Sequence, residues 1–594
     1  MIRKLVRRML TAQVFSALTV SLCLLIDNIM IGRFLGEEGI AAYGLANPLL
    51  LAIGAFGSLL AAGIQVTCSR SLGLGLQEET NAGYSSAVFI SAVVSGLFML
   101  AVLLFTSFFA GVMGAGSSGP LFEQTRDYLA GFSIGAPGSI GALVLVPFLQ
   151  MAGKSGLLIA AVLTMTVTDV ALDLLNVLVF HGGMFGMGLA SALSYYAAMA
   201  VAAVYFLSPK CVFRFSLHRV TRATIAEIFR NGIPASFSMA AAVILVFLMN
   251  RLLLALGGEE SRAALAAFTV ITSIGNAAQC INTGTGGVSL TLAGILYSEE
   301  DRNGLKNLLQ LLCRYAVILG FGMGLFLVLS APLCAGLFLP EAGKAQDLAV
   351  LGLRIFAAGL IPCCVNSALK NAYQATERTV LTEVLSLAEG ALLPVFFAFL
   401  FSRFMGVPGA WLYFAAGETA ALGCIALVIW RRTGKKPWQD DAFLLLKKDF
   451  GAGPEDLMEV EIRSMQEVAA AAEKAEDFCL RRGQSGRLGN HIALCIEEMA
   501  GNTIQHGFSR DGKEHDLFVR MLHKEGYWVI RFRDDCSAFD PVHYLPAEGE
   551  ESVGIRLVLS LAEEARYTYS LNLNNLTLRL PEDRSGPEST GGKA

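Results

Sequence analysis

The sequence predicts an all-α polytopic membrane protein, with twelve spans in two six-helix bundles, followed by a cytoplasmic α/β-sandwich domain. The first evidence is the distribution of charge. Residues 1–430 hold 44 Asp, Glu, Lys and Arg residues and residues 431–594 hold 50, so the charged fraction rises about threefold at one point. Only the second part is charged like a water-soluble domain. The first part alternates long apolar runs with short polar breaks, which is typical of a multi-span membrane protein.

Twelve apolar runs in the first part are each long enough for a helix to cross about 30 Å of hydrocarbon. They cover residues 11–31, 44–68, 83–109, 126–152, 156–180, 186–207, 230–256, 263–294, 308–334, 346–372, 379–401 and 408–430. Counting from a cytoplasmic N-terminus places most basic residues of the short loops on the cytoplasmic side, where Lys and Arg accumulate. We therefore expect both termini in the cytoplasm.

The first part of the chain also repeats itself. The stretch GFSIGAP (131–137) recurs as AAGLIP (357–362), and GMFGMGLASA (183–192) recurs as FMGVPGAWLY (404–413), displaced by about 221–225 residues. Six spans are thus duplicated, which predicts bundles at residues 1–222 and 223–432. An even span number makes the two halves parallel, and they face each other across a central cleft as in alternating-access transporters. A twelve-span scaffold without cargo is the alternative.

Three acids lie inside predicted spans. Asp27 belongs to the first span, and Asp169 and Asp173 belong to the fifth, where a spacing of four residues places both on one helical face. An ionised carboxylate in hydrocarbon costs about 3 kcal/mol or more, so these acids need a partner, a wet cavity or a proton. Such a cluster can take up a proton on one side of the membrane and release it on the other. The sequence therefore predicts a cation-coupling site.

The first span ends in IDNIMIGRFLG (26–36), and together with the acids it resembles the multidrug and toxic compound extrusion (MATE) transporters, in particular their DinF-like branch. The resemblance implies a bacterial cell-membrane protein that exports small organic or xenobiotic compounds in exchange for H⁺ or Na⁺. Asp27 and Asp173 match the family's acids, whereas Asp169 stands where an Asn is usual. Asn176 lies beside the acids and is expected in the substrate cleft. Glu389 and Glu418, in spans eleven and twelve, line the same cleft or are hydrogen-bonded packing acids.

The charged part begins with a linker at residues 433–455, and a domain is predicted at 456–582 with a disordered tail at 583–594. An alternating stretch at 458–465 predicts a first strand, and helical patterns follow at 465–482, 488–505 and 554–565. Further strands are expected at 515–524, 527–535, 565–572 and 574–580. The simplest packing for this order is one layer of helices on a mixed, mainly antiparallel sheet.

Three motifs in this domain point to a nucleotide. Glu498 and Asn502 lie four residues apart on one helical face, with His506 one turn further. An amide oxygen suits Mg²⁺, and a neighbouring carboxylate can act as a base in phosphoryl transfer. With RDDCSAFDP (533–541) and VGIRLVLSLA (553–562), this helix resembles the N, G1 and G2 boxes of the GHKL (Bergerat-fold) ATPases, especially the anti-sigma-factor serine kinases.

The GHKL resemblance implies a role for each matching residue. Asn502 would hold Mg²⁺ with ATP, Glu498 would be the catalytic base, and Asp534 would accept a hydrogen bond from adenine. Gly554 would let the helix start approach the phosphates, because free N–H groups favour anions. Cys536 replaces the usual Gly of the G1 box, so turnover is less firmly implied than binding.

The leading hypothesis is a cation-coupled exporter whose cytoplasmic domain binds ATP. That domain would phosphorylate Ser or Thr on a partner such as an anti-anti-sigma-like (STAS) protein, or report nucleotide level to the bundles. The rivals are a membrane-tethered signalling kinase with a sensing bundle and a lipid-linked sugar flippase. The net charge of −4 argues against nucleic acid as a partner, and the sequence has no Walker motif.

Overall fold

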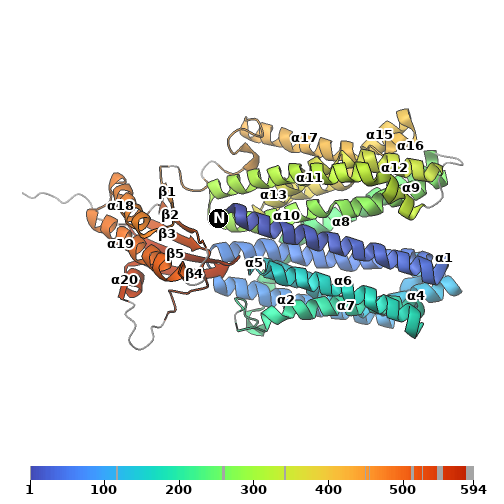
Figure 1. Cartoon of the computed structure of the whole chain (residues 1–594), viewed down its shortest axis with the longest axis horizontal. Coiled ribbons are helices and arrows are strands. Elements are labelled where there is room, and N and C mark those ends of the chain that lie inside the picture. Colours follow the sequence, from blue (N-terminus) through green and yellow to red (C-terminus); the bar gives the residue numbers. More distant parts are fainter. Residues whose placement is uncertain are drawn as a thin grey trace, which may run out of the picture.

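The protein is seen here as a computed structural model, in which a long bundle of helices carries a small sheet domain at one end (Figure 1). The predicted tail at 583–594 lies outside the described residues. The structure describes residues 2–115, 118–209, 211–256, 261–339, 343–447, 450–453, 455–509, 514–524, 526–544 and 553–582.

The first half of the helical part contains seven α-helices and two π-helical turns among its described residues. They are α1 (Ile2–Gly73), α2 (Gln77–Leu104), α3 (Thr106–Ala110), η1 (Gly111–Ala115), α4 (Pro120–Ser133), α5 (Ala136–Met151), α6 (Ser155–Leu175), η2 (Asn176–Phe180) and α7 (Gly183–Phe206). The second half consists of α8 (Arg222–Leu256), α9 (Ser261–Ala278), α10 (Cys280–Ser298), α11 (Arg302–Phe338), α12 (Lys344–Ala357), α13 (Leu360–Ala375), α14 (Thr379–Leu387), η5 (Ala388–Leu392), α15 (Leu393–Met405), α16 (Val407–Ala410) and α17 (Tyr413–Thr433).

Helix α1 is too long for one crossing. It has 72 residues, which would span about 110 Å in a straight line at 1.5 Å per residue. Both of its ends nevertheless contact the sheet domain: Lys4 Nζ donates to Asp535, and Arg566 donates to the carbonyl of Leu74, just after the helix. The element therefore reverses and crosses the bundle twice, so the first two predicted spans both fall within it.

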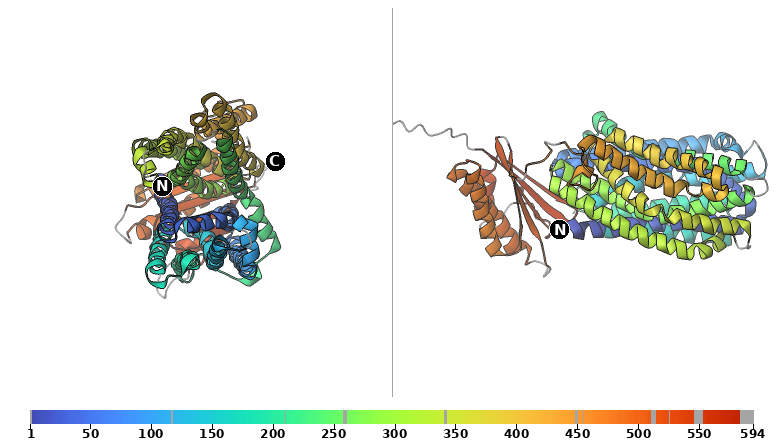
Figure 2. Two further views of the ribbon diagram at one scale, coloured as in Figure 1. Left: turned by 90° about the vertical axis from the view of Figure 1, so that its right-hand side faces the viewer. Right: turned by 90° about the horizontal axis from the view of Figure 1, so that it is seen from above.

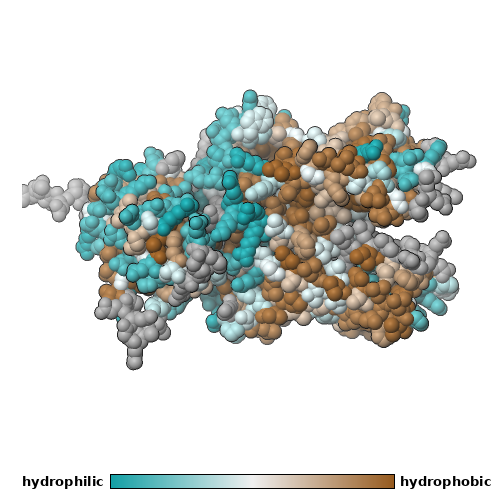
Figure 3. Space-filling model, in the orientation of Figure 1, coloured by the Kyte–Doolittle hydropathy of each residue, from teal (hydrophilic) through white to brown (hydrophobic). Residues whose placement is uncertain are grey.

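Eight helices of the described residues are long and apolar enough to cross a membrane, or up to ten if two bent pairs each count as one span. The bends are 46° between α4 and α5 and 47° between α12 and α13. The predicted spans at 11–31 and 263–294 are not among these; the second corresponds to α9 and α10, which are separated at Gln279. Twelve spans therefore remains a prediction. Apolar surface covers the middle of the helical part, as expected for contact with lipid (Figure 3).

The two halves meet tightly near the sheet domain, at what we call the proximal end, which carries the turns 74–76, 152–154 and 299–301. A Cβ on Gly63 of α1 would overlap the carbonyl oxygen of Ile228, and one on Gly232 of α8 would overlap that of Leu59. Backbones in such close approach allow no side chain between them. At the opposite, distal end the molecular surface is notched between the halves (Figure 3).

The sheet domain, which we call the C-terminal domain, has five strands in the order β1-β2-β3-β5-β4. Every strand pair is antiparallel. The sequence pattern predicted a mixed, mainly antiparallel sheet; the antiparallel pairing is confirmed, and the mixed character was wrong. The elements are β1 (Leu457–Ile462), α18 (Met465–Arg481), α19 (Gly486–Asn502), η7 (Thr503–Gly507), β2 (Leu517–Lys524), β3 (Tyr527–Asp534), α20 (Val553–Leu561), β4 (Glu564–Ser570) and β5 (Leu573–Pro581).

The two long helices of the C-terminal domain, α18 and α19, cover one face of this sheet. Trp528, Ile530 and Phe532 of β3 are buried in a core with α18 and α19, whose side chains include Phe478 and Ile496. Side chains alternate across a strand, so the residues between these point to the opposite face. That opposite face lies against the helical bundles (Figure 2).

Candidate functional site

One cavity of the C-terminal domain gathers the residues predicted from three separate motifs. Glu498 and Asn502 of α19, Asp534 at the end of β3 and Gly554 at the start of α20 all line a space of about 590 Å³. This volume is in the range of pockets that hold small molecules and cofactors. Residues spread over 57 positions of sequence are thus brought to one place by the packing of two helices on the sheet.

Helix α20 approaches α19 closely at position 554, which is a glycine. A Cβ there would lie 2.7 Å from the Glu498 Cδ and overlap its carboxylate oxygen. The start of α20 therefore approaches Glu498 as closely as backbone allows. A helix start offers free N–H groups, which favour the negative charge of a phosphate.

Asp534 is held in place by neighbours that sequence reasoning missed. Its Oδ1 accepts hydrogen bonds from the Asn574 amide at 2.7 Å and from the backbone N–H of Cys536 at 3.0 Å. Burial raises the pKa of this carboxyl, and these hydrogen bonds oppose the rise. Tyr567 donates to the Asn574 oxygen at 2.7 Å and also lines the cavity. The NN pair at the start of β5 was the available signal.

The cysteine that follows Asp535 is accommodated by the helix that faces it. Cys536 is buried, and a Cβ on Gly507 would lie 3.0 Å from its sulfur. A glycine in η7 thus provides the space that the extra side chain of Cys536 requires. His506, also in η7, is exposed and lines the same cavity.

The three membrane acids come together between α1 and α6. Asp27, Asp169 and Asp173 are 7%, 3% and 0% exposed, and the three interact electrostatically with one another. Neither carboxylate oxygen of Asp173 has a hydrogen-bond partner within the described part of the chain. Three acids in one buried group can bind a cation or share protons, because their charges cannot all be left uncompensated.

Asn176 has a local structural role. Its amide oxygen accepts from the Gly182 backbone N–H, and its amide nitrogen donates to the carbonyl of Gly183, each at 3.1 Å. It therefore ties η2 to the start of α7, and this accounts for its burial without a substrate.

The two glutamates of the second half have protein partners, which favours the packing interpretation over the substrate cleft. Glu389 in η5 forms an ion pair with Lys370 of α13 at 3.0 Å. Glu418 of α17 accepts from the Asn366 amide at 2.8 Å and is buried. Sequence reasoning missed Lys370 and Asn366; a lysine inside the predicted span 346–372 was the available signal.

Comparison with known proteins agrees with this architecture. Residues 13–175 match the MatE family model. A crystal structure of MATE in complex with MaL6 has a TM-score of 0.67 at 20% identity, covering 71% of this chain and 94% of that one. A transporter of the MOP superfamily from Pyrococcus furiosus gives 0.66 at 20%, with 71% and 94% covered. A mutant of the Vibrio cholerae MATE transporter VcmN gives 0.66 at 16%, with 74% and 98% covered.

No curated protein gives a significant match. Because the identities to the solved structures are low, these similarities establish the fold alone. The MatE match covers residues 13–175, which is most of the first half of the helical part. The chain is therefore a multi-pass membrane protein with the MATE transporter fold, and its residues 13–175 carry the MatE family pattern.

Proposed function

We propose that the helical part is a cation-coupled antiporter that exports small organic compounds, with Asp27, Asp169 and Asp173 binding the coupling ion, H⁺ or Na⁺. The observation that carries this proposal is the burial of all three acids in one group within a MATE-type fold. Three buried carboxylates that lie together are stable when they bind a cation or are protonated. Release of that cation changes the charge between α1 and α6. A cargo molecule that binds one of the two charge states more tightly is thereby coupled to the ion.

Asp173→Asn tests this assignment, because the substitution keeps the shape of the side chain and removes its charge. We expect ion-driven efflux in inverted vesicles to fall at least tenfold. Asp127→Asn is the matched control, since Asp127 is an acid of the same bundle that is half-exposed and pairs with Arg126. Imposing H⁺ and Na⁺ gradients separately identifies the ion. Efflux at the wild-type rate in Asp173→Asn would contradict the assignment.

We infer that the C-terminal domain binds ATP with Mg²⁺ and lies in the cytoplasm, together with the N-terminus. The fit rests on the cavity, because the Asn502 amide, the Glu498 and Asp534 carboxylates and the helix start at Gly554 line one space, as the resemblance to the GHKL ATPases implies. Asn502 would hold the metal, Asp534 the adenine, and Glu498 would orient or deprotonate an attacking hydroxyl. When bound, ATP would supply a phosphoryl group for a Ser or Thr of a partner such as a STAS protein.

Asn502→Ala should lower Mg-ATP binding by the purified full-length protein at least tenfold. Gln505→Ala is the control, because Gln505 lies on the next turn, is exposed and does not line the cavity. Failure of the wild-type protein to bind Mg-ATP would refute the nucleotide site while leaving the antiporter proposal intact. A signalling kinase with a sensing bundle predicts ATP binding without ion-driven efflux, so the two assays together separate the hypotheses.

A further inference from the structure

The sheet face opposite α18 and α19 is bound to both halves of the membrane part. Strand β3 shows how the two faces differ. Phe532 and Asp534 line the cavity, whereas Arg531 and Arg533 point the other way, to the turn at 299–301 between α10 and α11. One strand therefore serves the proposed nucleotide site and a docking surface at the same time.

The contact with the second half is a group of ion pairs and hydrogen bonds. Arg533 pairs with Glu299, which is 7% exposed, and Arg531 donates to the Glu299 carbonyl at 2.7 Å. The Glu299 carboxylate raises the pKa of Arg533 against the lowering effect of burial. Arg520 lies 3.3 Å from the carboxylate of Asp301, and both are buried. Removing one partner from such a buried group would leave the other as an uncompensated charge, so breaking this contact is costly.

The linker is anchored to the same half. Arg302 at the start of α11 pairs with Asp441 at 2.5 Å, and the rings of Tyr297 and Phe450 stack with centroids 4.9 Å apart. The C-terminal domain is therefore fixed to the second half both through its sheet and through the chain that leads to it.

The contact with the first half is made by the turn between β4 and β5. The backbone N–H of Leu571 donates to the Met151 carbonyl at 2.6 Å, and the Asn572 amide donates to the Gly153 carbonyl at 3.1 Å. Both turn residues have positive φ, 58° and 62°, as a tight two-residue hairpin requires. Gly153 also has positive φ, and a Cβ there would lie 2.6 Å from the Asn572 nitrogen, so the two turns fit closely.

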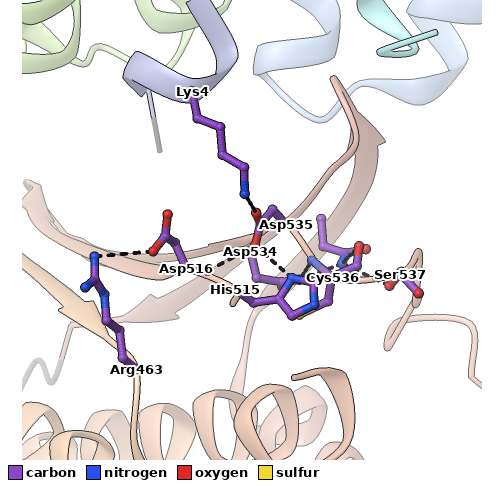
Figure 4. A network of polar contacts seen from close by, with 9 residues as sticks. Lys4, Arg463, His515, Asp516, Asp534, Asp535, Cys536 and Ser537 are labelled. Atoms are coloured by element: carbon purple, nitrogen blue, oxygen red, sulfur yellow. Dashed lines mark hydrogen bonds and ion pairs between the residues drawn. The ribbon is translucent and has the colours of Figure 1, made fainter. Parts of the chain in front are cut away.

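A second contact with the first half reaches the cavity loop directly. Lys4 of α1 donates to Asp535 at 3.0 Å, and Asp535 follows Asp534 in the chain (Figure 4). Asp535 also accepts from His515 and from the Asp516 backbone, each at 3.0 Å. Burial opposes ionisation of Asp535, but these hydrogen bonds outweigh it and lower its pKa. The first helix is thus tied to the loop that bears the proposed adenine ligand.

We propose that the C-terminal domain is a clamp that holds the proximal ends of the two halves together, and that nucleotide in its cavity sets the strength of the clamp. The halves meet at this end through backbone contacts, a Gln65–Thr291 hydrogen bond of 3.0 Å and an Arg70–Glu377 ion pair. A transporter that alternates must separate them here. Because the sheet is bound to both, separation requires one set of its contacts to break.

The regulatory part rests on the proposed nucleotide site. Arg533, Asp534 and Asp535 are consecutive, and they face the second half, the cavity and the first half respectively. A ligand that moves Asp534 therefore displaces residues in both clamp contacts. The coupling is reciprocal. The factor by which bound nucleotide changes the equilibrium between closed and open proximal ends is also the factor by which opening changes the affinity for nucleotide.

The test measures the distance across the proximal end in the full-length protein. Glu79 in the first half and Asn303 in the second half are exposed. Each is replaced by a ketone-bearing amino acid that carries a spin label, and the distance between the two labels reports the width of the proximal end. Without nucleotide, Arg533→Gln is expected to raise the share of wide distances several-fold. Lys4→Ala, at a side chain that is 66% exposed, should do so to a smaller extent without threatening the fold. Arg579→Gln is the control, because Arg579 lies on the same sheet face but contacts Tyr527 and Glu563.

Unchanged distances in both Arg533→Gln and Lys4→Ala would overturn the clamp. Mg-ATP is expected to shift the wild-type distribution, and Lys4→Ala should lose at least half of that shift while still binding ATP. Binding of ATP to the wild type without any shift would overturn the regulation and leave the nucleotide site standing. Absence of ATP binding would refute the nucleotide site and the regulation with it, whereas the variants compared without nucleotide still decide the clamp.

Discussion

Gly554→Ala separates a folding requirement from a binding requirement in the C-terminal domain. The added Cβ would lie 2.7 Å from Cδ of Glu498 and 3.5 Å from its Cγ, and its three nearest atoms all belong to that side chain. These are the far end of a flexible side chain, so Glu498 can turn away at a cost of about 0.5–1.5 kcal/mol. Alanine is favoured over glycine in a helix by up to about 1 kcal/mol, which offsets that cost. The free energy of unfolding should therefore change by less than about 1 kcal/mol.

Nucleotide binding should change far more. The methyl group takes the place that the Glu498 carboxylate occupies beside the start of α20. The displaced carboxylate is left inside the cavity, where its negative charge opposes binding of a phosphate to the N–H groups of the helix start. Loss of one charge-assisted hydrogen bond costs about 1.5–3 kcal/mol, which corresponds to a roughly tenfold to hundredfold weaker Mg-ATP affinity. Calorimetric titration of the purified full-length protein, together with its thermal unfolding, measures both quantities.

Gly501→Ala is the matched control. It lies on α19 between Glu498 and Asn502 and does not line the cavity, and a Cβ there would meet only the terminal carbon of Met465, at 3.7 Å. This variant should bind Mg-ATP normally and unfold at an equal or higher temperature. Wild-type affinity in Gly554→Ala would refute the placement of phosphate at the start of α20. Unfolding of Gly554→Ala would show instead that the glycine is needed for packing.

Three further predictions follow from the described contacts. Burial raises the pKa of Asp534, so this carboxylate becomes protonated at a higher pH than an exposed Asp does. ATP affinity should therefore begin to fall at that higher pH when the solution is acidified. Asp534→Asn should flatten this pH profile in a series of binding titrations. Lys370→Met should destabilise the protein in detergent by about 3–5 kcal/mol by leaving Glu389 unpaired, and Glu389→Gln in the same chain should restore most of the unfolding temperature. Gly63→Ala should reduce efflux at least tenfold, since its Cβ would overlap a backbone carbonyl of α8, whereas Gly96→Ala, with nothing within 4 Å, should transport normally.

The C-terminal domain was predictable because its signals are local. The helix predicted at 465–482 is α18 at Met465–Arg481, and the strand predicted at 527–535 is β3 at Tyr527–Asp534. A spacing of four residues placed Glu498 and Asn502 on the same helical face, whereas the role of Asp534 was implied only by the resemblance of its motif. In the structure all three residues line one cavity. The prediction that was wrong concerned strand pairing. Which strands are neighbours depends on contacts between residues distant in sequence, so the alternation of side chains within each strand could not exclude a mixed sheet.

The docking of the domain was beyond the reach of sequence patterns. Arg533 and Glu299 are 234 positions apart. In the sequence Arg533 is one charged residue near the end of a strand and Glu299 is one charged residue of a loop, and neither indicates the other as its partner. The partner of Glu389 likewise depends on how α13 packs beside η5, which places Lys370 next to it. Periodicity predicts which face of an element is polar, but it carries no information about the element that covers that face.

Helix α1 links the two proposed sites mechanically. It carries Lys4 near its start, in contact with Asp535, and Asp27 about 35 Å further along, at 1.5 Å per residue. A helix transmits axial displacement because its backbone hydrogen bonds run along its length. If α1 moves as a rigid body, movement of the Asp534–Asp535 loop would shift Asp27 relative to Asp169 and Asp173 on α6, which α1 also contacts. On this basis Lys4→Ala should reduce the effect of ATP on efflux, because it removes one of the contacts between α1 and the Asp534–Asp535 loop. An effect of ATP on efflux that equals the wild type's in Lys4→Ala would show that this contact is not the route between the sites.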